Sequence, residues 1–120
     1  MIPLAALALS SALNASTDMP VNVTSCTSEL TNSGQFGGSP ILTIGFTNTS
    51  SKTISSIVFG ISDGQDAEVP LTDAGTFNSG ATVRHTYTSP ISRVSGTKCV
   101  VRAVTFTDGD RWVAGTDTPH

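Results

Sequence analysis

The stretch Lys98–Gly115, KCVVRAVTFTDGDRWVAG, decides the fold of this chain. It begins with a run rich in Val, Thr and Phe, residues that suit a pleated, half-buried surface. Asp108-Gly109 interrupts this run, and Asp-Gly between two β-favouring runs is typical of a tight hairpin turn, because glycine adopts positive φ without steric cost. The sequence therefore predicts a strand over residues 99–107, a turn, and a return strand over residues 111–114.

Strict alternation along the first of these strands would split its large residues, with Cys99 and Val101 on one face and Val104 and Phe106 on the other. A β-bulge near Arg102 shifts the parity and brings all four inward. Burying Phe106 removes on the order of 150 Å² from water, which at about 25 cal/mol per Å² outweighs one lost ladder hydrogen bond. We therefore expect the bulge; a regular ladder with Phe106 exposed is the alternative.

Further segments carry strand signals, because alternating apolar residues are separated by turn-forming Gly, Asn, Asp, Ser and Pro. Pro70 indicates an edge strand, since proline has no N–H to donate. The expected strands cover residues 21–26, 41–48, 53–61, 69–71 and 81–88, and the expected loops include residues 31–40, 62–67, 72–80 and 89–96. In the first strand, Val21 and Val23 face one side and Cys26 the other. With the hairpin, these segments predict an all-β, two-sheet antiparallel sandwich of about seven strands, of immunoglobulin type.

The expected core follows from the apolar face of each strand. In the strand over residues 81–88, for example, Val83, His85 and Tyr87 share one face and Thr82, Arg84 and Thr86 the other. The expected core residues are Leu42, Ile44, Phe46, Ile57, Phe59, Val83, Tyr87, Val104 and Phe106.

The composition excludes several classes of protein. The chain has 120 residues, which suits one domain, and only 12% of them are charged. With a net charge of −3 and six scattered Lys and Arg residues, it offers no basic patch for nucleic acid. It also contains no run of the roughly 20 apolar residues that a membrane-spanning helix needs.

The N-terminal segment over residues 2–13, IPLAALALSSAL, has the apolar core and small-residue end of a secretory signal peptide, without a preceding Lys or Arg. Cleavage after Ala12 or Ala15 fits the small residues found there. We therefore expect residues 1–15 to be a signal peptide, residues 16–120 to be the domain, and the protein to be secreted, either extracellular or periplasmic. A buried N-terminal helix is the alternative for this segment.

The two cysteines, Cys26 and Cys99, are expected to form a disulfide, since an even number of cysteines in a secreted chain usually pairs. The bridge would close a loop long enough to contribute about 4 kcal/mol in the loop-entropy model. A metal pair or a catalytic thiol are the rival interpretations, but zinc requires three or four ligands and only His85 and His120 could join.

Residues 45–54, GFTNTSSKTI, resemble a hairpin of the FxLYD family of bacterial and archaeal secreted domains. Phe59-Gly60-Ile61-Ser62-Asp63 is similar to the motif that names the family: Phe59 and Asp63 match, while Ile61 and Ser62 stand in place of Leu and Tyr. Residues 75–80 resemble its glycine-containing loop. The likeness spans about residues 44–88 and implies an immunoglobulin-like extracellular module. The family has no shared catalytic residues, so the resemblance implies no site residue here.

The residues that could carry chemistry have simpler structural interpretations. His85 would need a nucleophile and an orienting carboxylate to act as a general base, and no nucleophile motif is present. Asp63, Asp66 and Glu68 share one loop and could form a weak cation site, but acidic residues also favour turns. Asp108 and Asp110 are too few for a calcium loop. We therefore expect no catalytic residue, metal site or cofactor.

Two further features of the sequence concern the surface of the protein. Trp112 could stack on a sugar ring, but after a hairpin it more often covers the end of the core. Asn14, Asn22 and Asn48 each begin an Asn-X-Ser/Thr glycosylation sequon, which matters in a eukaryotic source.

The expected function is that of a secreted, non-enzymatic immunoglobulin-like binding or accessory module that contacts a protein or cell-surface partner. The alternative is a structural subunit of an extracellular filament or surface assembly, with self-association through strand edges. An enzyme is the third hypothesis, and no catalytic constellation in the sequence supports it.

Overall fold

The computed structural model describes residues 19–30, 40–64, 68–91 and 94–115. Within them the chain forms seven strands and no helix. The strands are β1 (Val21–Leu30), β2 (Pro40–Asn48), β3 (Ile54–Ser62), β4 (Val69–Phe77), β5 (Thr82–Thr88), β6 (Lys98–Phe106) and β7 (Arg111–Val113).

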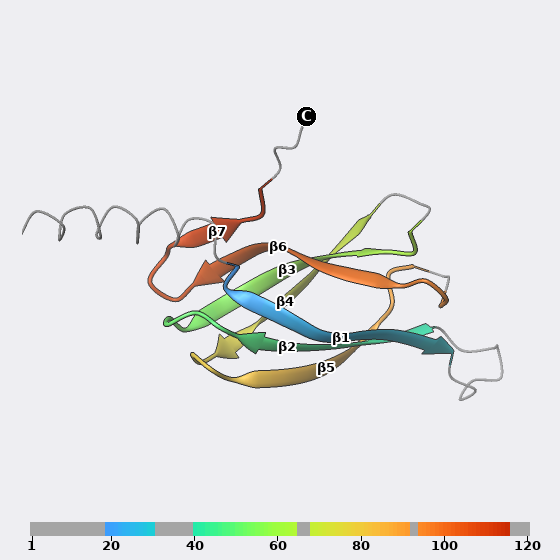
Figure 1. The fold of residues 1–120 in the computed structure, drawn as a ribbon, viewed down its shortest axis with the longest axis horizontal. Coiled ribbons are helices and arrows are strands. Elements are labelled where there is room, and N and C mark those ends of the chain that lie inside the picture. Colours follow the sequence, from blue (N-terminus) through green and yellow to red (C-terminus); the bar gives the residue numbers. More distant parts are fainter. Residues whose placement is uncertain (1–18, 31–39, 65–67, 92–93, 116–120) are drawn as a thin grey trace, which may run out of the picture.

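The strands form two antiparallel sheets, which Figure 1 shows as two layers. One sheet has the order β1-β2-β5 and the other the order β4-β3-β6-β7. This arrangement confirms the expected all-β, two-sheet sandwich. β1 and β5 are the edges of the smaller sheet, and β4 and β7 are the edges of the larger one, so the predicted edge position of the Pro70 strand is also confirmed.

The β6–β7 hairpin forms as predicted. Gly109 has a φ of 96°, and its N–H donates to the carbonyl of Phe106 at 3.0 Å, which closes the turn. Successive β3 residues Val58 and Phe59 pair with Ala103 and Val101, so Arg102 is the extra residue of a bulge. Val101, Val104 and Phe106 are all buried, whereas Val100 is 39% exposed. The expected bulge is therefore confirmed, and burial of the apolar residues is its physical reason.

A second bulge corrects the predicted first strand. The strand continues to Leu30, and its register against β2 shifts between Val23 and Ser25, which makes Thr24 the extra residue. Because the shift reverses the alternation, Cys26 lies on the same inner side as Val21 and Val23 and packs against the core. The prediction that Cys26 faces the other side was wrong, since it assumed an unbroken period of two.

The fourth strand is also longer than predicted. Residues 72–77, expected to be a loop, continue β4 as far as Phe77. Their inner side carries Asp73 and Phe77, which are both buried, so burial stabilises a strand despite the weak β-propensity of Asp, Ala and Gly. The turn to β5 occupies only residues 78–81, where Gly80 adopts a φ of 82°.

Seven of the nine predicted core residues are buried, and Val83 and Tyr87 are partly buried against them. Phe46 lies at the centre, with its ring centroid 5.5 Å from that of Phe59 and 5.3 Å from that of Phe77. Buried residues that the prediction did not assign to the core include Val21, Ile54, Ile61 and Phe77.

The expected signal peptide, residues 1–15, lies outside the described residues. In the part of the chain that is described, no helix has the length and apolar character needed to cross a membrane.

Candidate functional site

The most concentrated polar cluster joins the two sheets at the side where β4 and β5 are the edge strands. Asp73 comes from β4, and His85 and Tyr87 come from the inner face of β5. Asp73 Oδ2 lies 2.7 Å from His85 Nδ1 and accepts a hydrogen bond of 2.7 Å from the Tyr87 hydroxyl. We call these three residues the Asp73 clasp. Since β4 and β5 belong to different sheets, the clasp ties the layers together.

The surroundings of the clasp are partly apolar. Asp73 is only 8% exposed, so its carboxylate needs the two hydrogen bonds to offset the loss of water. The His85 ring packs edge-on near Phe46 and Phe77, while 44% of its side chain remains exposed. Burial, followed by the hydrogen bond to Asp73, raises the pKa of Tyr87 well above its usual value. Tyr87 therefore stays a neutral donor at physiological pH.

The clasp contains the orienting carboxylate that sequence analysis could not assign to His85. An Asp–His pair acts in nucleophilic catalysis when the imidazole also reaches a Ser, Thr or Cys. No such side chain in the described part of the chain hydrogen-bonds His85; its polar partner there is Asp73. Among the described residues, the contacts of Asp73 with His85 and Tyr87 are those of a tie between the two sheets. Asp73 was missed because it fell in a predicted loop, although the hydroxyl of Tyr87, a predicted core residue, required a hydrogen-bond partner.

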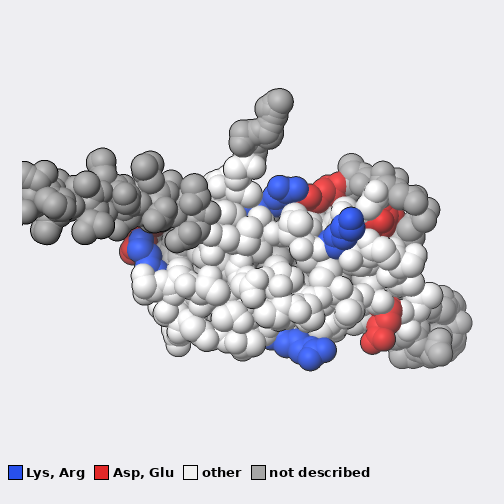
Figure 2. All heavy atoms as spheres, in the orientation of Figure 1, with Lys and Arg blue, Asp and Glu red and all other residues white. Residues whose placement is uncertain are grey.

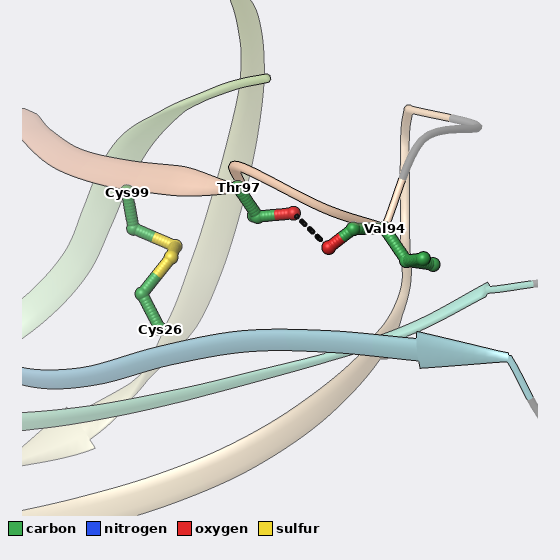
Figure 3. Close-up of a disulfide and its surroundings, with 4 residues drawn as sticks. All are labelled: Cys26, Val94, Thr97 and Cys99. Atoms are coloured by element: carbon green, nitrogen blue, oxygen red, sulfur yellow. Dashed lines mark hydrogen bonds between the residues drawn. A yellow bond between two sulfur atoms is a disulfide. The ribbon is translucent and has the colours of Figure 1, made fainter. Parts of the chain in front are cut away.

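The disulfide between Cys26 and Cys99 is present and joins β1 to β6 (Figure 3). The two Cα atoms are 5.9 Å apart, within the usual range for a disulfide. Nearby, the Thr97 hydroxyl donates to the carbonyl of Val94 at 3.2 Å, which holds the chain as it enters β6. The disulfide therefore ties the sheets together on the β1 side, and the Asp73 clasp does so on the β4–β5 side.

Two groups of charged residues form ion pairs on or beside the larger sheet. Arg102 donates two hydrogen bonds of 2.7 Å to the Glu68 carboxylate, which lies over Gly60 and leaves no room there for a Cβ. This hydrogen bonding lowers the pKa of Glu68 and raises that of Arg102. Arg102, the extra residue of the bulge, is exposed and directs its side chain outward from the sheet.

The acidic residues of the hairpin turn bind a lysine. Lys52, from the β2–β3 turn, forms ion pairs with both Asp108 and Asp110 and lies 5.2 Å from the centre of the Phe106 ring. Hydrogen bonds to Asp110 and then Asp108 raise the pKa of Lys52. The backbone N–H of Asp110, and then Lys52, lower the pKa of Asp108. These exposed ion pairs connect the β2–β3 turn to the β6–β7 turn. Both carboxylates are therefore already paired with a lysine of the same chain.

The acidic loop that sequence analysis considered for a cation is described only in part. Glu68 is paired with Arg102, and Asp66 lies outside the described residues. In the ranges that the structure describes, no group of three or more His, Cys, Asp or Glu residues could hold a metal ion.

The glycosylation sequons differ in accessibility. Asn48 is fully buried, and its Nδ2 donates to the carbonyls of Lys52 and Phe77 at 2.8 and 2.9 Å. It serves as the anchor of the β2–β3 turn and cannot carry a glycan in the folded chain. Asn22 is exposed on β1, and Asn14 lies outside the described residues. Trp112 is partly buried against the core, as expected for a residue that covers its end.

The outer face of the β1–β2–β5 sheet is a polar surface, of which sequence analysis identified only the face of β5 that carries Thr82, Arg84 and Thr86. The Thr47 and Thr82 hydroxyls are 3.0 Å apart, and those of Thr43 and Thr86 are 3.5 Å apart. Gly45 has no side chain at the centre, and a Cβ there would collide with the hydroxyls of Thr24 and Ser25. We call this surface the hydroxyl face; its residues are Thr24, Ser25, Thr27, Thr43, Thr47, Thr82 and Thr86, with Arg84 beside Gly45.

Charged residues are also sparse elsewhere on the molecule. In the view of Figure 2, the Lys, Arg, Asp and Glu side chains form small separate groups with broad uncharged areas between them.

No protein-family model, curated protein or solved structure matches this chain. The resemblance to the FxLYD family therefore stays a prediction.

Proposed function

We propose that this protein is a secreted, non-enzymatic, immunoglobulin-like module that binds a protein or cell-surface partner through its outer surface. The hydroxyl face carries the proposal. It combines a row of paired threonines with a single arginine, on a sheet whose inner side is filled by the core. Hydroxyl groups can both donate and accept hydrogen bonds, so the surface suits a polar, uncharged partner.

The disulfide supports the proposed location outside the cytoplasm. Structural disulfides form and persist in oxidising compartments and are rare in the reducing cytosol. Cys26 and Cys99 are the only two cysteines of the chain and are joined to each other. The apolar N-terminal segment, read as a signal peptide, supports the same location.

The proposal is tested by binding of the labelled mature protein to the surface of cells of its source. We expect saturable binding that unlabelled protein displaces. A Thr47→Arg variant should weaken this binding at least tenfold, because a long charged side chain would lie among the hydroxyl groups that contact the partner. Thr72→Arg is the matched control: Thr72 is exposed on the outer side of β4, on the other sheet, and its variant should bind normally.

Equal binding by the two variants would show that the hydroxyl face is not the contact surface. The absence of saturable binding, together with a hydrolytic activity that His85→Ala abolishes without unfolding the protein, would overturn the proposal in favour of an enzyme. The alternative of a filament subunit predicts open-ended growth, which light scattering would detect as a mass that rises continuously with concentration.

A further inference from the structure

The four edge strands differ in how well they are protected from pairing with another chain. β4 contains Pro70, which lacks an N–H, and its register against β3 is irregular between Ile54 and Ser56. β5 is tied to β4 by the Asp73 clasp, and β7 has only three residues. β1 spans ten residues and has no proline, lysine or arginine. It is therefore the longest edge among the described strands and the least protected.

The hydrogen-bond directions show which backbone groups of β1 point outward. Asn48 N donates to Ala81 O and Ser89 N donates to Pro40 O, so Pro40, Asn48 and the even-numbered residues between them face β5. The odd-numbered residues of β2 consequently face β1. Beyond the bulge, their partners are Ser25, Thr27 and Glu29. The backbone N–H and C=O groups of Cys26, Ser28 and Leu30 therefore point away from β2, toward the open edge.

The segment Ser25–Leu30 is also held firmly in place. It lies beyond the bulge at Thr24, so its pairing with β2 is regular over six residues, and the disulfide at Cys26 anchors it to β6. A strand that is ordered before binding loses less conformational entropy when it pairs. The side chain of Ser28 adds no polar obstacle at the edge, since it points toward the interior, where its hydroxyl has no hydrogen-bond partner among the described groups.

The charge of the segment indicates the orientation in which two copies of it can pair. Glu29 is its single charged residue and lies near one end. Parallel pairing of two such segments would place the two Glu29 side chains side by side, where like charges repel. Antiparallel pairing about a twofold axis places them at opposite ends, beside uncharged Ser and Thr residues. It also joins two three-stranded sheets into one of six strands and closes the assembly, because the same edge is used on both copies.

We propose that the β1 segment Ser25–Leu30 is a self-association surface that pairs antiparallel with the same segment of a second copy of this chain. The resulting dimer goes beyond the proposed binding function, because it leaves the hydroxyl threonines of β2 and β5 exposed. The two proposals therefore fail independently of each other.

The test is the molar mass of the full mature protein, measured by light scattering over a range of concentrations. We expect a dimer. Ser28→Pro removes an edge N–H that makes no bond to β2 and should weaken dimerisation at least tenfold, whereas Ser28→Ala keeps the N–H and should dimerise normally. Thr27→Glu adds a carboxylate that faces either its own copy or Glu29 of the second chain in an antiparallel pair, so like charges repel and the variant should act like Ser28→Pro. Thr47→Glu is its control, with the same charge on β2 of the same face.

Circular dichroism and thiol titration establish that each variant remains folded and oxidised. A wild-type protein that stays monomeric at the highest concentration reached would overturn the proposal. A dimer that survives both Ser28→Pro and Thr27→Glu would overturn it too, since another surface would then be responsible. A monomer that instead takes up an unrelated extended peptide along β1 would show that the edge serves a different partner.

Discussion

Removal of the Asp73 carboxylate should destabilise the sandwich more than loss of any exposed ion pair. Asp73 accepts two hydrogen bonds of 2.7 Å, and hydrogen bonds to charged groups contribute about 1.5–3 kcal/mol each. The bond to His85 is worth less than this range, because 44% of the His85 side chain is exposed to screening by water. Asp73→Ala should therefore lower the free energy of unfolding by about 2–4 kcal/mol, a large part of the 5–15 kcal/mol typical of a domain.

Equilibrium urea denaturation of a double-mutant cycle isolates the interaction. With Asp73→Ala and Tyr87→Phe as the single variants, we expect a coupling energy of about 1–2 kcal/mol, since each variant removes the same hydrogen bond. Glu68→Gln is the control: it breaks an exposed ion pair with Arg102 and should cost less than about 1 kcal/mol. A coupling energy near zero, or an Asp73→Ala variant no less stable than Glu68→Gln, would refute the clasp as a tie between the sheets.

Three further predictions test the fold. Replacing Cys26 and Cys99 together by Ala should lower the free energy of unfolding by about 4 kcal/mol, since the bridge spans 73 residues; a loss below about 1 kcal/mol would contradict the loop-entropy argument. Phe59→Ala should cost about 3–5 kcal/mol in denaturant unfolding, because Phe59 is fully buried beside Phe46, and a cost below about 1 kcal/mol would place it outside the core. Tyr87 is the single tyrosine of the chain, so tyrosinate absorbance reports it alone. The pKa of Tyr87 is raised in the folded state, so folding favours the protonated phenol. The stability that results is fully present below pH ~10, the pKa of tyrosine in the unfolded chain, and is lost as the pH rises from there through the pKa of the folded protein. Ionisation near pH 10 in the folded protein would be inconsistent with the clasp.

The strands and most of the core could be predicted because each depends on a local pattern. Alternation in β2 and β3 placed Leu42, Ile44 and Phe59 inward, and the apolar residues on both sides of Arg102 required a bulge. The bulge at Thr24 was not predictable in the same way, because small polar residues around it give no apolar signal. Only the register of β1 against β2 shows this bulge.

The clasp and the hydroxyl face depend on contacts between distant segments. Asp73 lies in a run of residues with weak β-propensity, and its burial comes from the partners supplied by β5. The threonine pairs required the register of β2 against β5, which no single segment encodes. The disulfide could be predicted because the chain contains only two cysteines, so one pairing was available.

The intact mass of the unreduced protein, recovered from outside the cytoplasm of cells that express the full chain, tests the central claim most directly. The account predicts a chain that begins at Leu13 or Ser16, with a mass two hydrogen atoms below that of the dithiol form and with the Cys26 and Cys99 peptides linked after proteolysis. A chain that retains Met1, remains in the cytoplasm and carries two thiols that react with an alkylating agent would contradict the claim of a secreted, disulfide-closed sandwich.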